Sequence, residues 1–207
     1  GDERGGQPQH LEQDFGIRQR ALAPCAAVEQ RRQRVDGYRA ELELLRDDLR
    51  ARRRAVTSRW NEERFAPRPA TALRFTVEAT NRGEPCIDEL EVWSGGENVA
   101  LSAKPSSSGN LPGYPRHALA HINDGLVGND HSWISDAPGG GWVQLDLAEG
   151  HVVDRVVWAR DRSGRYDDRT PTRYRIELLD EGGAWTRVAG SQDRQEFGEE
   201  GGEERAL

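Results

Sequence analysis

The sequence contains no methionine and only two cysteines, Cys25 and Cys86. Neither cysteine belongs to a CxxC pair, and no CxxCH haem-attachment motif occurs. This segment therefore carries no c-type haem and no cysteine cluster for structural zinc. The two cysteines lie far apart in regions of different character, which leaves two alternatives, one disulfide or two unrelated thiols. We favour the unrelated thiols.

Long hydrophobic runs are also missing, so no signal peptide and no membrane span is visible in this segment. The first residue is Gly1 rather than methionine. We therefore expect a processed chain or a piece of a longer protein, and such a piece would not itself carry a targeting signal.

The chain lacks a surplus of positive charge. It has 29 Lys and Arg against 36 Asp and Glu, a formal net charge of -7. Phosphate binding needs a cationic surface, so the balance argues against nucleic acid as a partner. The arginine run at positions 52–54 is interpreted as a solvated helix face balanced by nearby carboxylates.

Apolar residues are scarce as well, at 35%, while charged residues make up 31%. A chain of 207 residues is long enough for one packed domain and an appendage. The composition therefore predicts that part of the chain is solvated or extended. Residues 1–16 are polar and contain glycine, which predicts a flexible N-terminal segment.

Residues 17–64 have the pattern of a long α-helix. Apolar residues recur every seven positions, at Ala21, Val28, Val35, Leu42, Leu49 and Val56. Two more apolar residues, Tyr38 and Leu45, lie three positions after members of this series, as in a heptad repeat. This pattern predicts a coiled-coil-like stalk. Because a heptad seam needs a facing helix, we expect a partner helix in another chain or in a missing segment of this one.

From residue 65 to residue 194 the periodicity changes to two. Alternating apolar and polar positions occur in six segments, which are residues 73–79, 87–93, 142–147, 152–160, 172–179 and 185–190. Turn residues separate them. Short strands without intervening helices predict a mainly β fold, an antiparallel β-sandwich or jelly roll. The acidic, glycine-rich residues 195–207 are predicted to be a disordered tail.

The order of several segments is similar to that of a known family. NVALSAKPSSS is followed by ALAHINDG, SWIS, GWVQLDL, VVDRVVWARDR and PTRYRIELLDEGGAWTRVA, between Asn98 and Ala189. This order resembles the discoidin domain, also called the coagulation-factor type C domain, of the galactose-binding-like superfamily. The resemblance implies a discoidin-like jelly roll that binds ligands with loops at one end and usually catalyses no reaction.

One feature departs from the family's order. The segments ALRFTVEA and CIDELEVW resemble the pair that usually closes the domain, yet here they come first. We therefore predict a circularly permuted arrangement, which is physically feasible where termini are neighbours. The segments EPCIDELEV, HINDG and RDRSGRYDDR look most like the variety found in planctomycete multi-domain proteins that also carry c-type cytochrome modules. The resemblance alone implies an extracytoplasmic location, periplasmic or cell surface.

The stretch RHALAHINDGLVGNDHSWIS contains three histidines and raises the question of a metal. His117 and His121 have the spacing of two zinc ligands on a helix, with Asp124 or His131 as a further ligand. However, the local sequence does not predict a stable helix, and no HExxH motif is present. A loop of Asn, Asp and Gly suits calcium better, because calcium takes six to eight oxygen ligands.

The discoidin resemblance implies particular calcium ligands. The Asp of the DG pair and a Glu of the closing strand correspond to Asp124 and Glu89. The loop would add carbonyl oxygens of His121, Leu126 and Asn129 and the hydroxyl of Ser132. We therefore expect one structural calcium, which ties the long loop to the first strands. A metal-free hydrogen-bonded turn is the alternative.

Loop side chains supply the candidate ligand-binding surface. An aromatic ring can cover the apolar face of a sugar, while Arg or His can bind hydroxyl or anionic groups. The candidates are Tyr114, Arg160, Arg162, Arg165 and Tyr166. Alternatively, the arginines of this loop pair with the neighbouring aspartates as ordinary surface ion pairs.

These observations favour a non-catalytic binding module, for a carbohydrate or a protein ligand, within a larger extracytoplasmic multi-domain protein. A structural spacer or interaction domain without a soluble ligand is the alternative. No G-x-S-x-G, P-loop or Rossmann fingerprint occurs, and we do not expect an enzyme.

Overall fold

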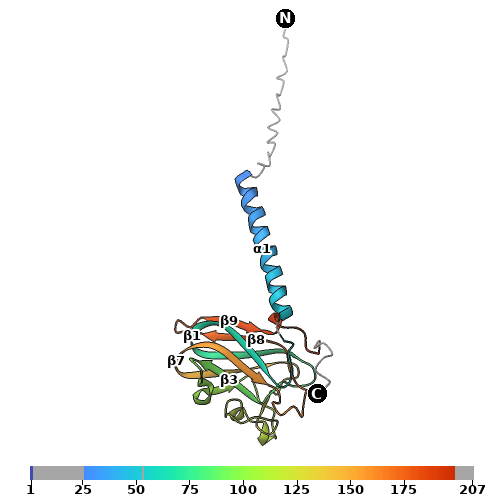
Figure 1. Cartoon of the computed structure of the whole chain (residues 1–207), viewed down its shortest axis with the longest axis vertical. Coiled ribbons are helices and arrows are strands. Elements are labelled where there is room, and N and C mark those ends of the chain that lie inside the picture. Colours follow the sequence, from blue (N-terminus) through green and yellow to red (C-terminus); the bar gives the residue numbers. More distant parts are fainter. Residues whose placement is uncertain (2–25, 53, 199–207) are drawn as a thin grey trace. The chain divides into compact units, whose positions relative to one another are not determined.

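The computed structural model describes Gly1, residues 26–52 and residues 54–198, without the side chains of residues 46–52. The chain divides into two compact units, residues 1–43 and residues 44–207. The first contains most of a helix, and the second contains the strands (Figure 1). The predicted class is confirmed: the protein is mainly antiparallel β with a helix before it.

Helix α1 spans Ala26–Arg52. Ion pairs one turn apart support it, since Asp36 lies 4.0 Å from Arg32 and 3.8 Å from Arg39. The seam residues of α1 whose side chains the structure describes are all exposed, namely Val28, Val35, Tyr38, Leu42 and Leu45. Their exposure is compatible with the predicted partner helix, and the coiled coil stays a prediction. The described helix is not long and apolar enough to cross a membrane.

The helix is shorter than predicted at its C-terminal end. It ends at Arg52, and residues from Asn61 onward belong to a strand. Val56, taken as a seam position, is only 2% exposed and packs in the core of the second unit. Heptad spacing alone cannot distinguish a buried valine of a neighbouring domain from another seam position. Positions 17–25, with Ala21 and Cys25, lie outside the described residues.

The second unit consists of nine described strands and four short 3₁₀ turns. The strands are β1 (Asn61–Thr80), β2 (Cys86–Ile87), β3 (Glu89–Ser94), β4 (Glu97–Asn98), β5 (Lys104–Ser107), β6 (Trp133–Ile134), β7 (Gly141–Ala159), β8 (Pro171–Leu179) and β9 (Trp185–Gly190). The 3₁₀ turns are η1 (Val99–Ser102), η2 (Pro115–His117), η3 (Leu119–His121) and η4 (Ser191–Asp193).

Two long strands, β1 and β7, run through both layers of the sandwich. Their pairing is interrupted by register shifts between Arg64 and Arg68 and between Ala70 and Ala72. The part of β7 that pairs with β1 before Ala70 also pairs with β3 on its other edge. From Ala72 onward, β1 pairs with β8 on its other edge, and β8 in turn pairs with β9. In Figure 1, β8 and β9 accordingly lie in one layer and β3 in the other.

Aromatic side chains join the two layers. Trp158 of β7 contacts Phe75 and Tyr174, with ring centroids 5.2 Å and 4.9 Å apart. All three are almost completely buried. Such edge and stacked contacts add about 0.5–1.5 kcal/mol per pair beyond area burial. The Tyr174 hydroxyl donates to the Glu63 carboxylate, which also accepts from Arg194. The core beside Tyr174 therefore contains a buried ion pair between Glu63 and Arg194.

Most predicted strands occur where the alternation placed them. The segment 185–190 coincides with β9, and residues 172–179 lie in β8. The segments at 142–147 and 152–160 form one continuous strand, β7, that ends at Ala159. The described part of the predicted disordered tail is partly ordered, because Phe197 packs against the core.

Candidate functional site

Three loops meet at one end of the sandwich. They connect β1 to β3, β5 to β7, and β7 to β8. Backbone hydrogen bonds join them across long sequence distances, such as Cys86 N to Arg169 O at 3.0 Å and Ser135 N to Pro85 O at 3.0 Å. The long loop from Ser108 to Gly140 contains most candidate site residues, and the strand ends hold it in place.

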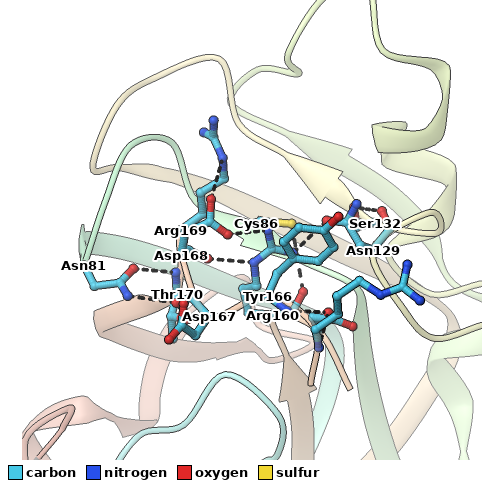
Figure 2. Close-up of polar contacts among 12 residues, drawn as sticks. Asn81, Cys86, Asn129, Ser132, Arg160, Tyr166, Asp167, Asp168, Arg169 and Thr170 are labelled. Carbon is cyan, nitrogen blue, oxygen red and sulfur yellow. Dashed lines mark hydrogen bonds and ion pairs between the residues drawn. The ribbon is translucent and has the colours of Figure 1, made fainter. Parts of the chain in front are cut away.

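Arg160 is the centre of this loop assembly (Figure 2). Its guanidinium donates to the Asp168 carbonyl at 2.6 Å, to the Asp168 carboxylate at 2.8 Å and to the Asn129 side-chain oxygen at 3.0 Å. The Tyr166 ring lies 5.3 Å from the guanidinium carbon. Only 2% of Arg160 is exposed. Its donors are thus used inside the protein, and we leave Arg160 out of the proposed ligand surface.

The turn after Arg160 is organised by Asp161, a buried residue. Its carboxylate accepts hydrogen bonds from the backbone nitrogens of Ser163 at 3.0 Å, Arg165 at 3.0 Å and Tyr166 at 2.9 Å. This arrangement holds Arg165 and Tyr166 at the surface, where Tyr166 is 41% exposed. The structure therefore keeps two of the predicted ligand-binding residues accessible.

Arg162 points to a different neighbourhood. Its guanidinium contacts the Glu91 carboxylate at 2.6 Å and lies over the Trp60 ring, 4.7 Å from the ring centroid. Neither Glu91 nor Trp60 belongs to the long loop that carries Tyr114. The predicted ligand-binding residues consequently do not form one patch.

The start of β3 lies against the loop that carries Asp124. Gly125 N donates to Glu89 Oε1 at 3.1 Å, and Gly128 N donates to Asp88 Oδ2 at 3.0 Å. The strand of Glu89 thus lies beside the Asp124 turn. Glu89 Oε2 and Asp88 Oδ1 are buried and have no hydrogen-bond partner among the described residues.

Burial changes the acidity of both carboxyls. It raises the pKa of Glu89 to about 8, against a hydrogen bond from Gly125, and nearby Asp124 adds to the rise. Burial also raises the pKa of Asp88, although hydrogen bonds from Arg162 and Gly128 oppose it. A bound cation would favour the ionised form of both groups and give the unpartnered oxygens a ligand.

The other predicted calcium ligands lie in the same loop but already make contacts. The Ser132 hydroxyl donates to the Asn129 carbonyl at 3.0 Å and lies 2.7 Å from His117 Nδ1. Leu126 N donates to Asp124 Oδ1 at 2.8 Å. The Asn129 carbonyl and the Ser132 hydroxyl thus satisfy each other, so an ion that used both would replace this hydrogen bond.

Two histidines approach Asp124. His131 Nδ1 lies 3.2 Å from Asp124 Oδ2, and the rings of His121 and His131 have centroids 5.0 Å apart. One donor atom from each of the three residues lies within 4.8 Å of the other two. His117 does not join them, because its ring is buried against Ser132, and burial lowers its pKa.

An open pocket of about 390 Å³ lies beside this loop. Tyr114, which is 57% exposed, is one of its walls, and His117 is another. The remaining lining residues are Asn110, Leu111, Gly113, Pro115, Ala118 and Leu119. Trp133 Nε1 donates to the Asn110 side-chain oxygen at 2.9 Å, which fixes the orientation of that amide.

Hydrogen bonds connect the pocket with the Arg160 assembly. His117 contacts Ser132, Ser132 contacts the Asn129 backbone, and the Asn129 side chain accepts from Arg160. The pocket wall and the Tyr166 turn are therefore parts of one continuous loop structure.

No family model, curated protein or solved structure matches the chain.

Two features of the site were absent from the sequence prediction. The family resemblance named Glu89 alone and gave no role to Asp88, which directly precedes it; alternation in a strand places such neighbours on opposite faces. β3 begins only at Glu89, so Asp88 is free of that alternation. For Arg160, the neighbouring aspartates gave a local signal for the pair with Asp168, whereas the contact with Asn129, 31 residues away, had none.

Proposed function

We propose that the β unit is a non-catalytic, discoidin-like binding module that binds a carbohydrate in the pocket beside Tyr114. The exposed ring of Tyr114 at the edge of this pocket carries the proposal. An exposed tyrosine offers a flat apolar face for the C–H groups of a sugar ring and a hydroxyl at its rim.

The size and lining of the pocket support this class of ligand. A volume of about 390 Å³ lies within the range of small-molecule sites. The Asn110 side-chain oxygen accepts from Trp133 and from Ser107, so its amide nitrogen is the group left for a ligand hydroxyl. His117 Nδ1 contacts Ser132, which leaves the other ring nitrogen for the pocket. An aromatic face with a few fixed polar groups is typical of carbohydrate recognition.

The setting of the module follows the discoidin resemblance. We infer that it belongs to a larger, extracytoplasmic multi-domain protein, with circularly permuted strands. The helix before it would then be a stalk with a helical partner. A protein ligand in place of a glycan would use the same loops.

A structural calcium is part of the same proposal. Glu89 and Asp124 would hold it, since Glu89 has a buried carboxylate oxygen without a partner and lies next to the Asp124 turn. Carbonyl oxygens of the loop would complete the oxygen ligands that calcium prefers. Such an ion would stabilise the loop that carries the Tyr114 pocket.

A spacer without a soluble ligand is the second candidate, favoured by a different observation. Leu101, Leu126 and Val127 are exposed, and the Leu101 side chain lies next to Gly125. Exposed apolar side chains that gather on one surface suit packing against a neighbouring domain.

A glycan array tests the proposed function. We expect the wild-type chain to bind a defined set of glycans and Tyr114→Ala to lose this binding while its thermal unfolding is unchanged. Arg187→Ala, an exposed change on β9 outside this pocket, serves as the matched control and should bind like wild type. Absence of binding across a broad array would favour the spacer.

A further inference from the structure

His121, Asp124 and His131 form a compact cluster of metal-binding side chains. One nitrogen or oxygen atom from each lies within 4.8 Å of the other two. Zinc bonds of about 2.0–2.2 Å in a tetrahedral site place two ligand atoms about 3.4 Å apart. The three side chains therefore need only small shifts to hold one ion.

The hydrogen bond that His121 makes leaves its other ring nitrogen for a metal. The carbonyl oxygen of Arg116 accepts from His121 Nδ1 at 3.1 Å, which places the proton on Nδ1. The Nε2 atom of a neutral His121 then carries a free lone pair. Histidines that bind metals commonly donate their other ring N–H to a carbonyl or carboxylate in this way, which fixes the ring.

Hydrogen bonds to the strand fix the backbone on both sides of Asp124. Leu90 N of β3 donates to the Ile122 carbonyl at 2.7 Å, and Gly125 N donates to Glu89. At the other end, His131 N donates to the Gly128 carbonyl at 3.0 Å. The loop is thus held in place around the cluster, which reduces the ordering that metal binding requires.

We propose that His121, Asp124 and His131 bind a divalent transition-metal ion of the zinc class. Two imidazoles and one carboxylate suit Zn²⁺, Ni²⁺ or Cu²⁺, whereas calcium and magnesium prefer oxygen ligands alone. The His131 side chain is 42% exposed, so an ion can reach the cluster from solvent.

This site is independent of carbohydrate binding, because neither His121 nor His131 lines the Tyr114 pocket. It differs from the calcium proposal in its ligands. The two share Asp124, but calcium depends on the buried Glu89 and the transition metal depends on the two histidines. Variants of Glu89 and of the histidines therefore separate the two ions.

Isothermal titration of the tag-free, metal-stripped protein with Zn²⁺ tests the proposal, with Co²⁺ absorption as a second measurement. We expect one ion per cluster and Co²⁺ bands in the visible range. His131→Gln and His121→Ala should each weaken Zn²⁺ binding by at least about tenfold, because even loss of a group that only orients a ligand costs about that much. Circular dichroism of the metal-free variants should match that of wild type.

His151→Ala is the matched control, since His151 lies on β7 outside the cluster. It should leave Zn²⁺ affinity unchanged. The proposal is overturned if the wild-type protein binds no stoichiometric Zn²⁺, or if the double variant of His121 and His131 binds as tightly.

Discussion

Arg160 shows how a single buried side chain holds the loop end together. It donates to Asp168 from the loop after it and to Asn129 from the long loop. The sequence left two alternatives for this arginine, a ligand contact or an ion pair with a neighbouring aspartate, and in the structure it pairs with Asp168. Asn129 comes from a separate loop, so the burial of Arg160 depends on how the loops fold together and not on its neighbours in sequence alone.

Arg160→Ala should lower the free energy of unfolding by about 1–3 kcal/mol, because the Asp168 carbonyl and the Asn129 side chain lose their donor while the Asp168 carboxylate is partly exposed to solvent. Arg165→Ala removes an exposed arginine from the same loop and should change stability by less than about 0.5 kcal/mol. Urea unfolding of both variants measures the difference. Equal stabilities would mean that Arg160 does not hold the loops.

Glu89 decides the calcium proposal. Ca²⁺ added to the metal-stripped wild-type protein should raise its melting temperature. At a free ion concentration 100 times the Kd, the free energy of unfolding should increase by about 2.7 kcal/mol. Glu89→Gln should abolish this increase, because it removes a charged ligand and keeps the side-chain shape. Glu97→Gln, at an exposed carboxylate, should keep it. A wild-type melting temperature that does not respond to Ca²⁺ contradicts the proposal.

At the scale of elements, α1 presents an exposed row of apolar side chains. Leu42 lies in the heptad seam, whereas Leu44 is exposed but lies outside it. If the seam binds a second helix of the same chain, Leu42→Asn should shift the protein from dimer to monomer in sedimentation equilibrium, and Leu44→Asn should not. A monomeric wild-type protein would instead favour a helix partner outside this segment.

The strands show how much of the fold follows from pattern. Alternation located β8 and β9 within a residue, because one face of each strand is buried against the core. The first half of β1 was missed, since its sequence contains Pro67 and Pro69 and ends the helix pattern. That half is a strand because it pairs with β7, a contact remote in sequence.

The site was predictable only in part, for the same reason. The adjacency of Glu89 and Asp124 followed from the family resemblance, and the structure places the two segments together. The cluster of His121, Asp124 and His131 depends on how the loop turns at Gly125 and Gly128, which have positive φ angles of 79° and 108°. Glycine permits these conformations, but the spacing of the histidines does not reveal where they lead.

At the scale of the whole molecule, the β unit combines a rigid frame with one loop-rich end. The long strands β1 and β7 belong to both layers, and the aromatic contacts of Trp158 join the layers. Loops fixed to such a frame can present a preformed site, which reduces the entropy lost on binding. The Tyr114 pocket, the contact between Gly125 and Glu89, and the two histidines all lie in these loops or at their junction with the strands.

Two exposed tyrosines of this end make the decisive comparison. Tyr114 lines the pocket, whereas Tyr166 stacks on Arg160 outside it. Isothermal titration with a glycan that the array identifies should show that Tyr114→Ala loses at least about tenfold in affinity, the equivalent of 1.4 kcal/mol. Tyr166→Ala should bind like wild type. Wild-type affinity in Tyr114→Ala, or loss of binding in Tyr166→Ala alone, would contradict a carbohydrate site beside Tyr114.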